Sequence, residues 1–295
     1  LSGRNITITN SQFVDLLGLE ATGDLKINAQ SIFSDGAISV AGTTDLTGRV
    51  ELNHVDNEFI GAITLNSEGQ ASLTGKNGLR FNSIQVNRVD DFDQGQSQTH
   101  PEDSLELTPA TLRLHATSGD IFAEGPVVAD SVQLMLADGG NVMMIHQDNR
   151  FGLDEHFTAS PYYPEFAASS GGVTGRLGNV YVSDSTDMMI INTDWTAEGD
   201  AAIRAAGDVV LYSMGDLGLG DGSGNETFIH ADGNIVLAAV GNFYNDSNRD
   251  NPLETDNRWL VYSSRPDHNV NDLEMNYEFI SYSRDFSLAN PIPED

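Results

Sequence analysis

The 295-residue chain has no cysteine, few basic residues and no long apolar run. The missing cysteines exclude disulfides, so packing and hydrogen bonding alone must hold the fold. Because no segment approaches ~18 uninterrupted apolar residues, we expect no transmembrane helix. Fourteen Lys and Arg residues against 44 Asp and Glu residues give a net charge of −30. Such a chain cannot neutralise phosphates in number, which excludes nucleic acid and anionic membrane surfaces as partners.

Sustained helical periodicity is also missing. Short runs instead alternate apolar and polar residues with a period of two, as in NITIT from Asn5, VELNHV from Val50 and AITLNS from Ala62. Gly, Asn, Asp or Ser closes each of these runs. A hydrophobic content of 39% is sufficient for a packed core. The pattern therefore predicts an all-β protein.

One short phrase recurs along the chain: glycine, then Asp or Asn, then two apolar residues separated by one position. Each such turn starts one short strand, so a chain of these starts is a repeat protein. We expect the glycine to adopt a positive φ at a tight corner, and the Asp or Asn to satisfy backbone groups there. The copies start at Gly23, Gly119, Gly178, Gly207, Gly215, Gly233 and Gly241.

This repetition also favours one architecture over another. The strands of a β-sandwich differ from one another, whereas identical turns stacked on each other are what a parallel β-helix needs at every coil. Two adjacent spacings between turn glycines add up to roughly 20 residues, which is a typical length for one coil. We therefore predict a parallel β-helix, a solenoid, over residues 1–245.

Two stretches interrupt the repeat and predict inserted loops, near residues 87–105 and near residues 148–172. Loops on a rigid scaffold often carry recognition, although variation in strand length or a small side module would also explain them. The repeat phrase stops at residue 245. We expect the aromatic-rich residues 246–295 to form a C-terminal cap without repeats, or the start of a following domain.

The segment Gly241–Asn269 carries a distinctive run after a GNF turn and an Asn-rich stretch: Arg258, Trp259, Leu260, Val261, Tyr262, Ser263 and Pro266. This run, with the Gly-Asp repeats and the lack of cysteine, resembles bacterial exoproteins of the filamentous haemagglutinin family, the cargo of two-partner secretion. The resemblance implies a right-handed parallel β-helix, secreted to the bacterial cell surface through an outer-membrane transporter, that acts as an adhesin or matrix protein. The family's amino-terminal secretion domain is not found here, which implies a downstream fragment of the shaft.

Candidate catalytic residues are few. Polysaccharide lyases and hydrolases with β-helical folds need clustered carboxylates, or an Arg or Lys base. Two groups come closest: Asp90, Asp91 and Asp93 near Arg88, and Asp154, Glu155 and His156 near Arg150. With 44 acidic residues such groups arise by chance, so we predict no catalytic residue.

Calcium is the better chemical candidate. Oxygen-bearing side chains alternate along one glycine-rich segment, at Asp221, Ser223, Asn225 and Thr227, and Asp232 stands at the twelfth position, where a calcium loop of this kind has its last ligand. However, Glu226 stands where a helix-flanked calcium loop requires glycine, and a glycine-rich corner explains the segment without metal. The seven histidines are scattered singly. We therefore predict no metal or cofactor site, with calcium as the one candidate.

Three functions remain open at this point. The resemblance favours a non-enzymatic secreted or cell-surface protein whose shaft presents loops to cells, glycans or matrix components. A carbohydrate-active β-helix enzyme is the first alternative, because such enzymes share the fold. A structural spacer without a ligand is the second.

Overall fold

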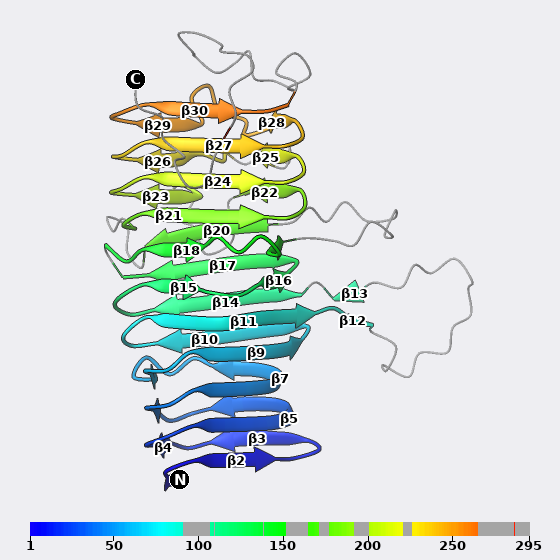
Figure 1. The fold of residues 1–295 in the computed structure, drawn as a ribbon, viewed down its shortest axis with the longest axis vertical. Coiled ribbons are helices and arrows are strands. Elements are labelled where there is room, and N and C mark those ends of the chain that lie inside the picture. The colour runs from blue at the N-terminus through cyan, green and yellow to red at the C-terminus, as the bar shows by residue number, and fades with distance from the viewer. Residues whose placement is uncertain are drawn as a thin grey trace, which may run out of the picture.

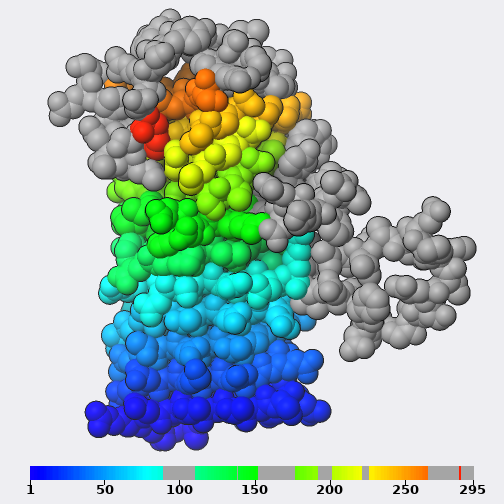
Figure 2. Space-filling view, turned by 45° about the vertical axis from the view of Figure 1, so that its right-hand side comes forward, coloured from blue at the N-terminus to red at the C-terminus, as the bar shows by residue number. Residues whose placement is uncertain are grey.

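The computed structural model describes residues 1–90, 107–108, 110–137, 139–151, 165–170, 177–191, 201–220, 226–264 and 286. Its strands lie one above another in a column that runs from the N-terminus to residue 262 (Figure 1). In Figure 2 the colours follow sequence order up the column, so each coil rests on the preceding one. No described segment is a helix, and none therefore could cross a membrane as one. The predicted all-β parallel β-helix is confirmed.

Two stacks of parallel strands build the lower part of the column. The first stack contains β2 (Ile6–Thr9), β5 (Leu25–Ser34), β7 (Thr44–Leu52), β9 (Ile63–Glu68), β11 (Leu79–Asn87), β16 (Val127–Ala129) and β19 (Arg150–Phe151). The second contains β3 (Phe13–Leu16), the later halves of β5 and β7, β10 (Gln70–Gly75), β14 (Thr111–Ala116), β17 (Ser131–Leu136) and β20 (Glu165–Ser170).

Further stacks complete the coils. A small sheet contains β1 (Ser2–Gly3), β4 (Leu19–Ala21), β6 (Ile38–Val40) and β8 (Glu58–Phe59). Above it the third stack joins β11 to β15 (Ile121–Ala123), β18 (Val142–Met144), β21 (Val180–Asp184), β24 (Val209–Ser213), β27 (Ile235–Ala239) and β30 (Trp259–Tyr262). Over β20 lie β22 (Met188–Ile190), β25 (Leu217–Leu219) and β28 (Phe243–Asn245), beside β23 (Ile203–Ala205), β26 (Ile229–Ala231) and β29 (Leu253–Thr255).

The core is a continuous apolar column inside these stacks. Ile27 pairs with Leu46, and Leu46 with Leu65, so one inward position is repeated in three successive coils. All three side chains are at most 1% exposed. Burying such a side chain contributes about 1.5–3 kcal/mol, and the apolar cluster extends from Ile6 to Leu253.

Side chains of the recurring phrase connect one coil to the next. Along one corner the backbone N–H of each Asp or Asn donates to the Oδ1 of its counterpart in the coil before, at 2.7–2.9 Å. The members of this column are Asp120, Asn141, Asn179, Asp208 and Asn234. A second column joins Asp187, Asp216 and Asn242. The predicted role of the Asp and Asn side chains is confirmed.

The glycine of the phrase has a different role from the predicted one. Of the seven copies only Gly119 has a positive φ, at 75°. At Gly178, Gly207 and Gly233 a Cβ atom would instead fall under 3.0 Å from the Oδ1 of the Asp or Asn in the coil before. Glycine is needed there because that oxygen occupies the space of a side chain.

The column continues beyond residue 245, where the sequence predicts its end. β29 pairs in parallel with β26, and β30 with β27. Most of the signature run, Trp259–Tyr262, is thus itself a ladder strand. The boundary moves at least to Tyr262, and of the later residues the structure describes Ser263, Ser264 and Phe286.

Candidate functional site

Both predicted insertions leave the column at one corner, where the chain passes from the first stack to the second. The first interrupts the chain between β11 and β14, and the second between β19 and β20. The strands before the two insertions, β11 and β19, pair with β16 from either side. The strands after them, β14 and β20, pair with β17 in the same way. In the intervening coil Asp130 alone forms this corner. The two insertions therefore emerge on the same edge, with one plain coil between them.

The second predicted insertion is narrower than 148–172. Asn149 is fully buried, accepting a bond from Val127 N (2.8 Å) and donating to Met144 O (2.8 Å). Residues Glu165–Ser170 form β20 and pair with β17. The interval between β19 and β20 is 152–164, which lies outside the described residues, as does most of 87–105.

The first insertion starts as a two-stranded stalk. Its described ends, β12 (Val89–Asp90) and β13 (Leu107–Thr108), form an antiparallel pair beside the column (Figure 1). Arg88 directly before the stalk donates to both carboxylate oxygens of Asp130, at 2.6 and 2.9 Å. The base of the insertion is therefore fixed to the plain coil above it.

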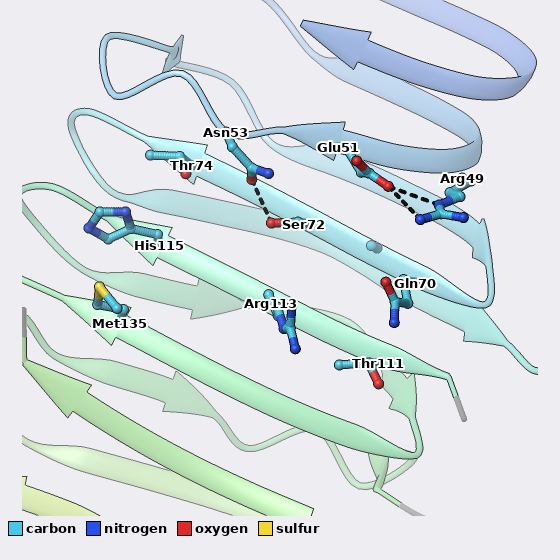
Figure 3. Close-up of a pocket in the computed structure, with 11 residues that line it drawn as sticks. Arg49, Glu51, Asn53, Gln70, Ser72, Thr74, Thr111, Arg113, His115 and Met135 are labelled. Carbon is cyan, nitrogen blue, oxygen red and sulfur yellow. Dashed lines mark hydrogen bonds and ion pairs between the residues drawn. The ribbon is translucent and has the colours of Figure 1, made fainter. Parts of the chain in front are cut away.

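A groove of about 470 Å³ lies on the outer face of the second stack, adjoining this corner. It crosses four neighbouring strands, β7, β10, β14 and β17 (Figure 3). Most of the residues that line it carry polar or charged side chains, and they are Arg49, Glu51, Asn53, Gln70, Ala71, Ser72, Thr74, Thr111, Arg113, His115 and Met135. Thr111 is the first residue of β14, the strand that follows the first insertion.

Strand register brings these side chains together. Gln70, Ser72 and Thr74 on β10 pair with Thr111, Arg113 and His115 on β14. Because side chains alternate along a strand, residues two apart point to the same face. The residues between them, such as Leu73 and Leu114, are buried and face the core. Apart from the buried Ala71 and from Asn53, which follows β7, the groove residues are thus outward members of strands whose inward members hold the column together.

Hydrogen bonds fix several of the charged and polar groups. Arg49 pairs with Glu51, with Nε 2.9 Å and a terminal nitrogen 2.7 Å from Oε1. Arg113 lies in the middle of the groove (Figure 3). Its Nε donates to Gln133 Oε1 at 2.9 Å. Burial lowers the pKa of His115, so its imidazole is neutral at pH 7.

The predicted acidic clusters lie mostly outside the part of the chain that the structure describes. Asp91, Asp93, Asp154, Glu155 and His156 lie outside the described residues. Asp90 ends β12 on the stalk, and Arg150 begins β19. Arg88, predicted as a neighbour of the first cluster, pairs with Asp130 instead.

The calcium hypothesis stays untested, because Asp221, Ser223 and Asn225 also lie outside the described residues. Thr227 is buried and its amide donates to Ser247 O, whereas Asp232 lies 3.5 Å from His230 Nε2. Within the described part of the chain, no group of three or more His, Asp or Glu side chains could hold a metal ion.

Two histidines have structural roles that the sequence did not reveal. In the turns His54–Asn57 and His146–Asn149, the histidine Nδ1 accepts the amide of the aspartate two residues later, at 3.2 Å in both. The asparagine ending each turn is fully buried. The shared spacing His-x-Asp-Asn was the signal that could have identified them.

One buried carboxylate, that of Asp184, is also unusual. Asp184 is 1% exposed and accepts bonds from Phe151 N and Thr186 N, both at 2.8 Å. Burial raises its pKa to about 7, and the nearby charge of Asp187 adds to the rise, whereas the bonds from Thr186 and Phe151 oppose it. This carboxyl group belongs to the wall of the column and lies apart from the groove residues.

Comparison with known proteins finds a similarity for the first coils only. A family model described as repeats of unknown function (DUF5649) matches residues 3–66. In this part Ile6, Leu25, Thr44 and Ile63 occupy one column position at 19-residue intervals. No curated protein and no solved structure matches the chain. The match supports a repeat protein.

Proposed function

We propose that the chain is a non-enzymatic secreted or cell-surface adhesin or matrix protein of filamentous haemagglutinin type. Its β-helical shaft would present the two insertions and the adjoining groove to cells, glycans or other matrix components. The observation that supports this most is their shared position: two insertions leave one corner, and the groove adjoins it. A spacer that binds nothing gives no reason for grouping them on one edge.

Removing the insertions tests this function without disturbing the column. In the first insertion, residues 91–106 are replaced by Asn-Gly, a two-residue turn suited to joining the antiparallel strands β12 and β13. In the second, 152–164 is replaced by a single aspartate, copying the corner at Asp130. We expect the intact chain, but not the doubly shortened one, to bind epithelial cells or immobilised glycans. Equal binding by both chains would contradict the role of the insertions, and no binding by either would favour a spacer.

Export is part of the same proposal. The resemblance carried by Arg258–Ser263 points to an outer-membrane transporter of two-partner secretion as the partner. Fused to a secretion domain of this class, the chain is expected to reach the medium only when the cognate transporter is expressed. Export without the transporter would contradict this partner.

A carbohydrate-active enzyme is the second candidate, and His115 is the observation that favours it. A neutral imidazole beside Arg113 could act as a general base on a bound sugar. Incubation with acidic polysaccharides should then yield new unsaturated or reducing ends. Turnover by the intact chain that is lost in the His115→Gln variant would favour an enzyme over an adhesin.

A further inference from the structure

We propose that the groove on β7, β10, β14 and β17 binds an extended polysaccharide that carries carboxylates, a polyuronate. This inference deepens the proposed function, on which it rests, by naming the ligand class of the groove.

The charge of the groove differs from that of the molecule. The chain carries −30, yet the lining holds Arg49 and Arg113 against Glu51 alone. Glu51 is already paired with Arg49. An anionic ligand that is repelled by most of this surface would therefore find its most favourable contacts here.

The donor geometry suits carboxylates in particular. A guanidinium group presents parallel N–H donors that match the two oxygens of a carboxylate. Arg113 is oriented by its Nε bond to Gln133 (2.9 Å), so its position in the middle of the groove is set by the neighbouring strand. The amide of Gln70 and the hydroxyl of Thr111 lie in register beside it and can bind sugar hydroxyls.

The shape of the groove suits a polymer. It spans four coils, and neighbouring strands are about 4.8 Å apart, so comparable outward positions repeat along the column axis. Among the described residues that line it, none is Phe, Tyr or Trp. Without an aromatic platform for sugar rings, recognition must depend on charge and hydrogen bonds, which favours charged over neutral sugars.

The test is calorimetric titration of the full chain with an oligogalacturonate, with the same oligomer after reduction of its carboxyl groups, and with dextran sulfate. We expect binding of the oligogalacturonate only. Arg113→Gln should weaken this binding about tenfold, the loss of a charge-assisted bond. Arg80→Gln is the matched control: it removes the same charge from another face, where Arg80 pairs with Glu124, and should change affinity less than about twofold.

Three outcomes would overturn the inference: no binding of the oligogalacturonate, equal binding of the carboxyl-reduced oligomer or of dextran sulfate, or equal losses in Arg113→Gln and Arg80→Gln. Unfolding curves of both variants show whether the column is intact. Cell binding that depends on the insertions is measured separately. If it persists while the groove binds no oligogalacturonate, the inference about the groove fails and the proposed function stands.

Discussion

Asp130 accepts two hydrogen bonds from the guanidinium group of Arg88, at 2.6 Å from Nε and 2.9 Å from a terminal nitrogen. The two side chains are only 15% and 18% exposed. The same carboxylate accepts the amide of Ala110, at 2.8 Å. Arg88 precedes the first insertion and Ala110 follows it, so one aspartate in the plain coil holds both of its ends.

Asp130→Asn tests this arrangement. Asparagine keeps one acceptor oxygen but loses the charge and one of the paired bonds, so we expect the free energy of unfolding to fall by about 2 kcal/mol. Asp45→Asn is the control, because Asp45 pairs with Lys26 in an exposed ion pair that should contribute less than about 1 kcal/mol. Urea unfolding measures both. Equal losses would mean that Asp130 has no special role.

Gly207 tests why the repeated phrase contains glycine. A Cβ at Gly207 would collide with Oδ1 of Asn179, the acceptor of the Asp208 amide. Gly207→Ala should therefore displace that bond and lower the free energy of unfolding by about 2 kcal/mol. A Cβ at Gly218 would meet only the flexible side chain of Met189, so Gly218→Ala should cost clearly less. Similar losses in the two variants would contradict the explanation.

The recurring phrase shows what the sequence could and could not predict. Repetition identified stacked coils, because identical turns imply identical positions. The reason for glycine could not be predicted, since the colliding oxygen of Asn179 lies in another coil. The end of the repeat was misplaced because β29 and β30 follow Pro252 and Arg258 with no glycine before them.

The groove was missed for a related reason. Gln70 and Thr111 are partners in register although the first insertion separates them in the sequence. No local motif joins Arg49, Arg113 and His115, and their positions depend on how many residues each coil contains. Nothing in the sequence indicated that the two predicted insertions share a corner, which became visible only when β16 and β17 were seen between the strands that flank them.

Asp184 predicts a pH dependence of stability. Its pKa is about 7 in the folded protein and near 3.8 when the chain is unfolded. Between these values the folded state binds more protons, so the free energy of unfolding falls as pH rises. The contribution is complete below pH ~4 and is lost as pH passes about 7, for a total of a few kcal/mol.

The difference between wild type and Asp184→Asn isolates this group from the other carboxylates. Asparagine cannot titrate, and it offers only one acceptor for the amides of Phe151 and Thr186, so the variant should be less stable at pH 5. This difference should shrink as pH rises to 8, because only the wild type loses stability through this group. Urea unfolding at several pH values measures it, and a constant difference would contradict the assignment.

Phe286 tests whether the end of the chain is part of the column. Its ring stacks on Tyr212 at a centroid distance of 5.2 Å and lies 5.5 Å from the ring of Tyr262. Tyr212 is on β24 and Tyr262 on β30, so one aromatic residue connects two coils of the third stack. Phe286→Ala removes these contacts, which contribute about 1 kcal/mol each beyond burial. We expect faster amide hydrogen exchange in β30 and unchanged exchange in β2, at the far end of the column. A cap that stabilises the last coil gives this local effect, whereas unchanged exchange in β30 would assign residues after 264 to a separate unit.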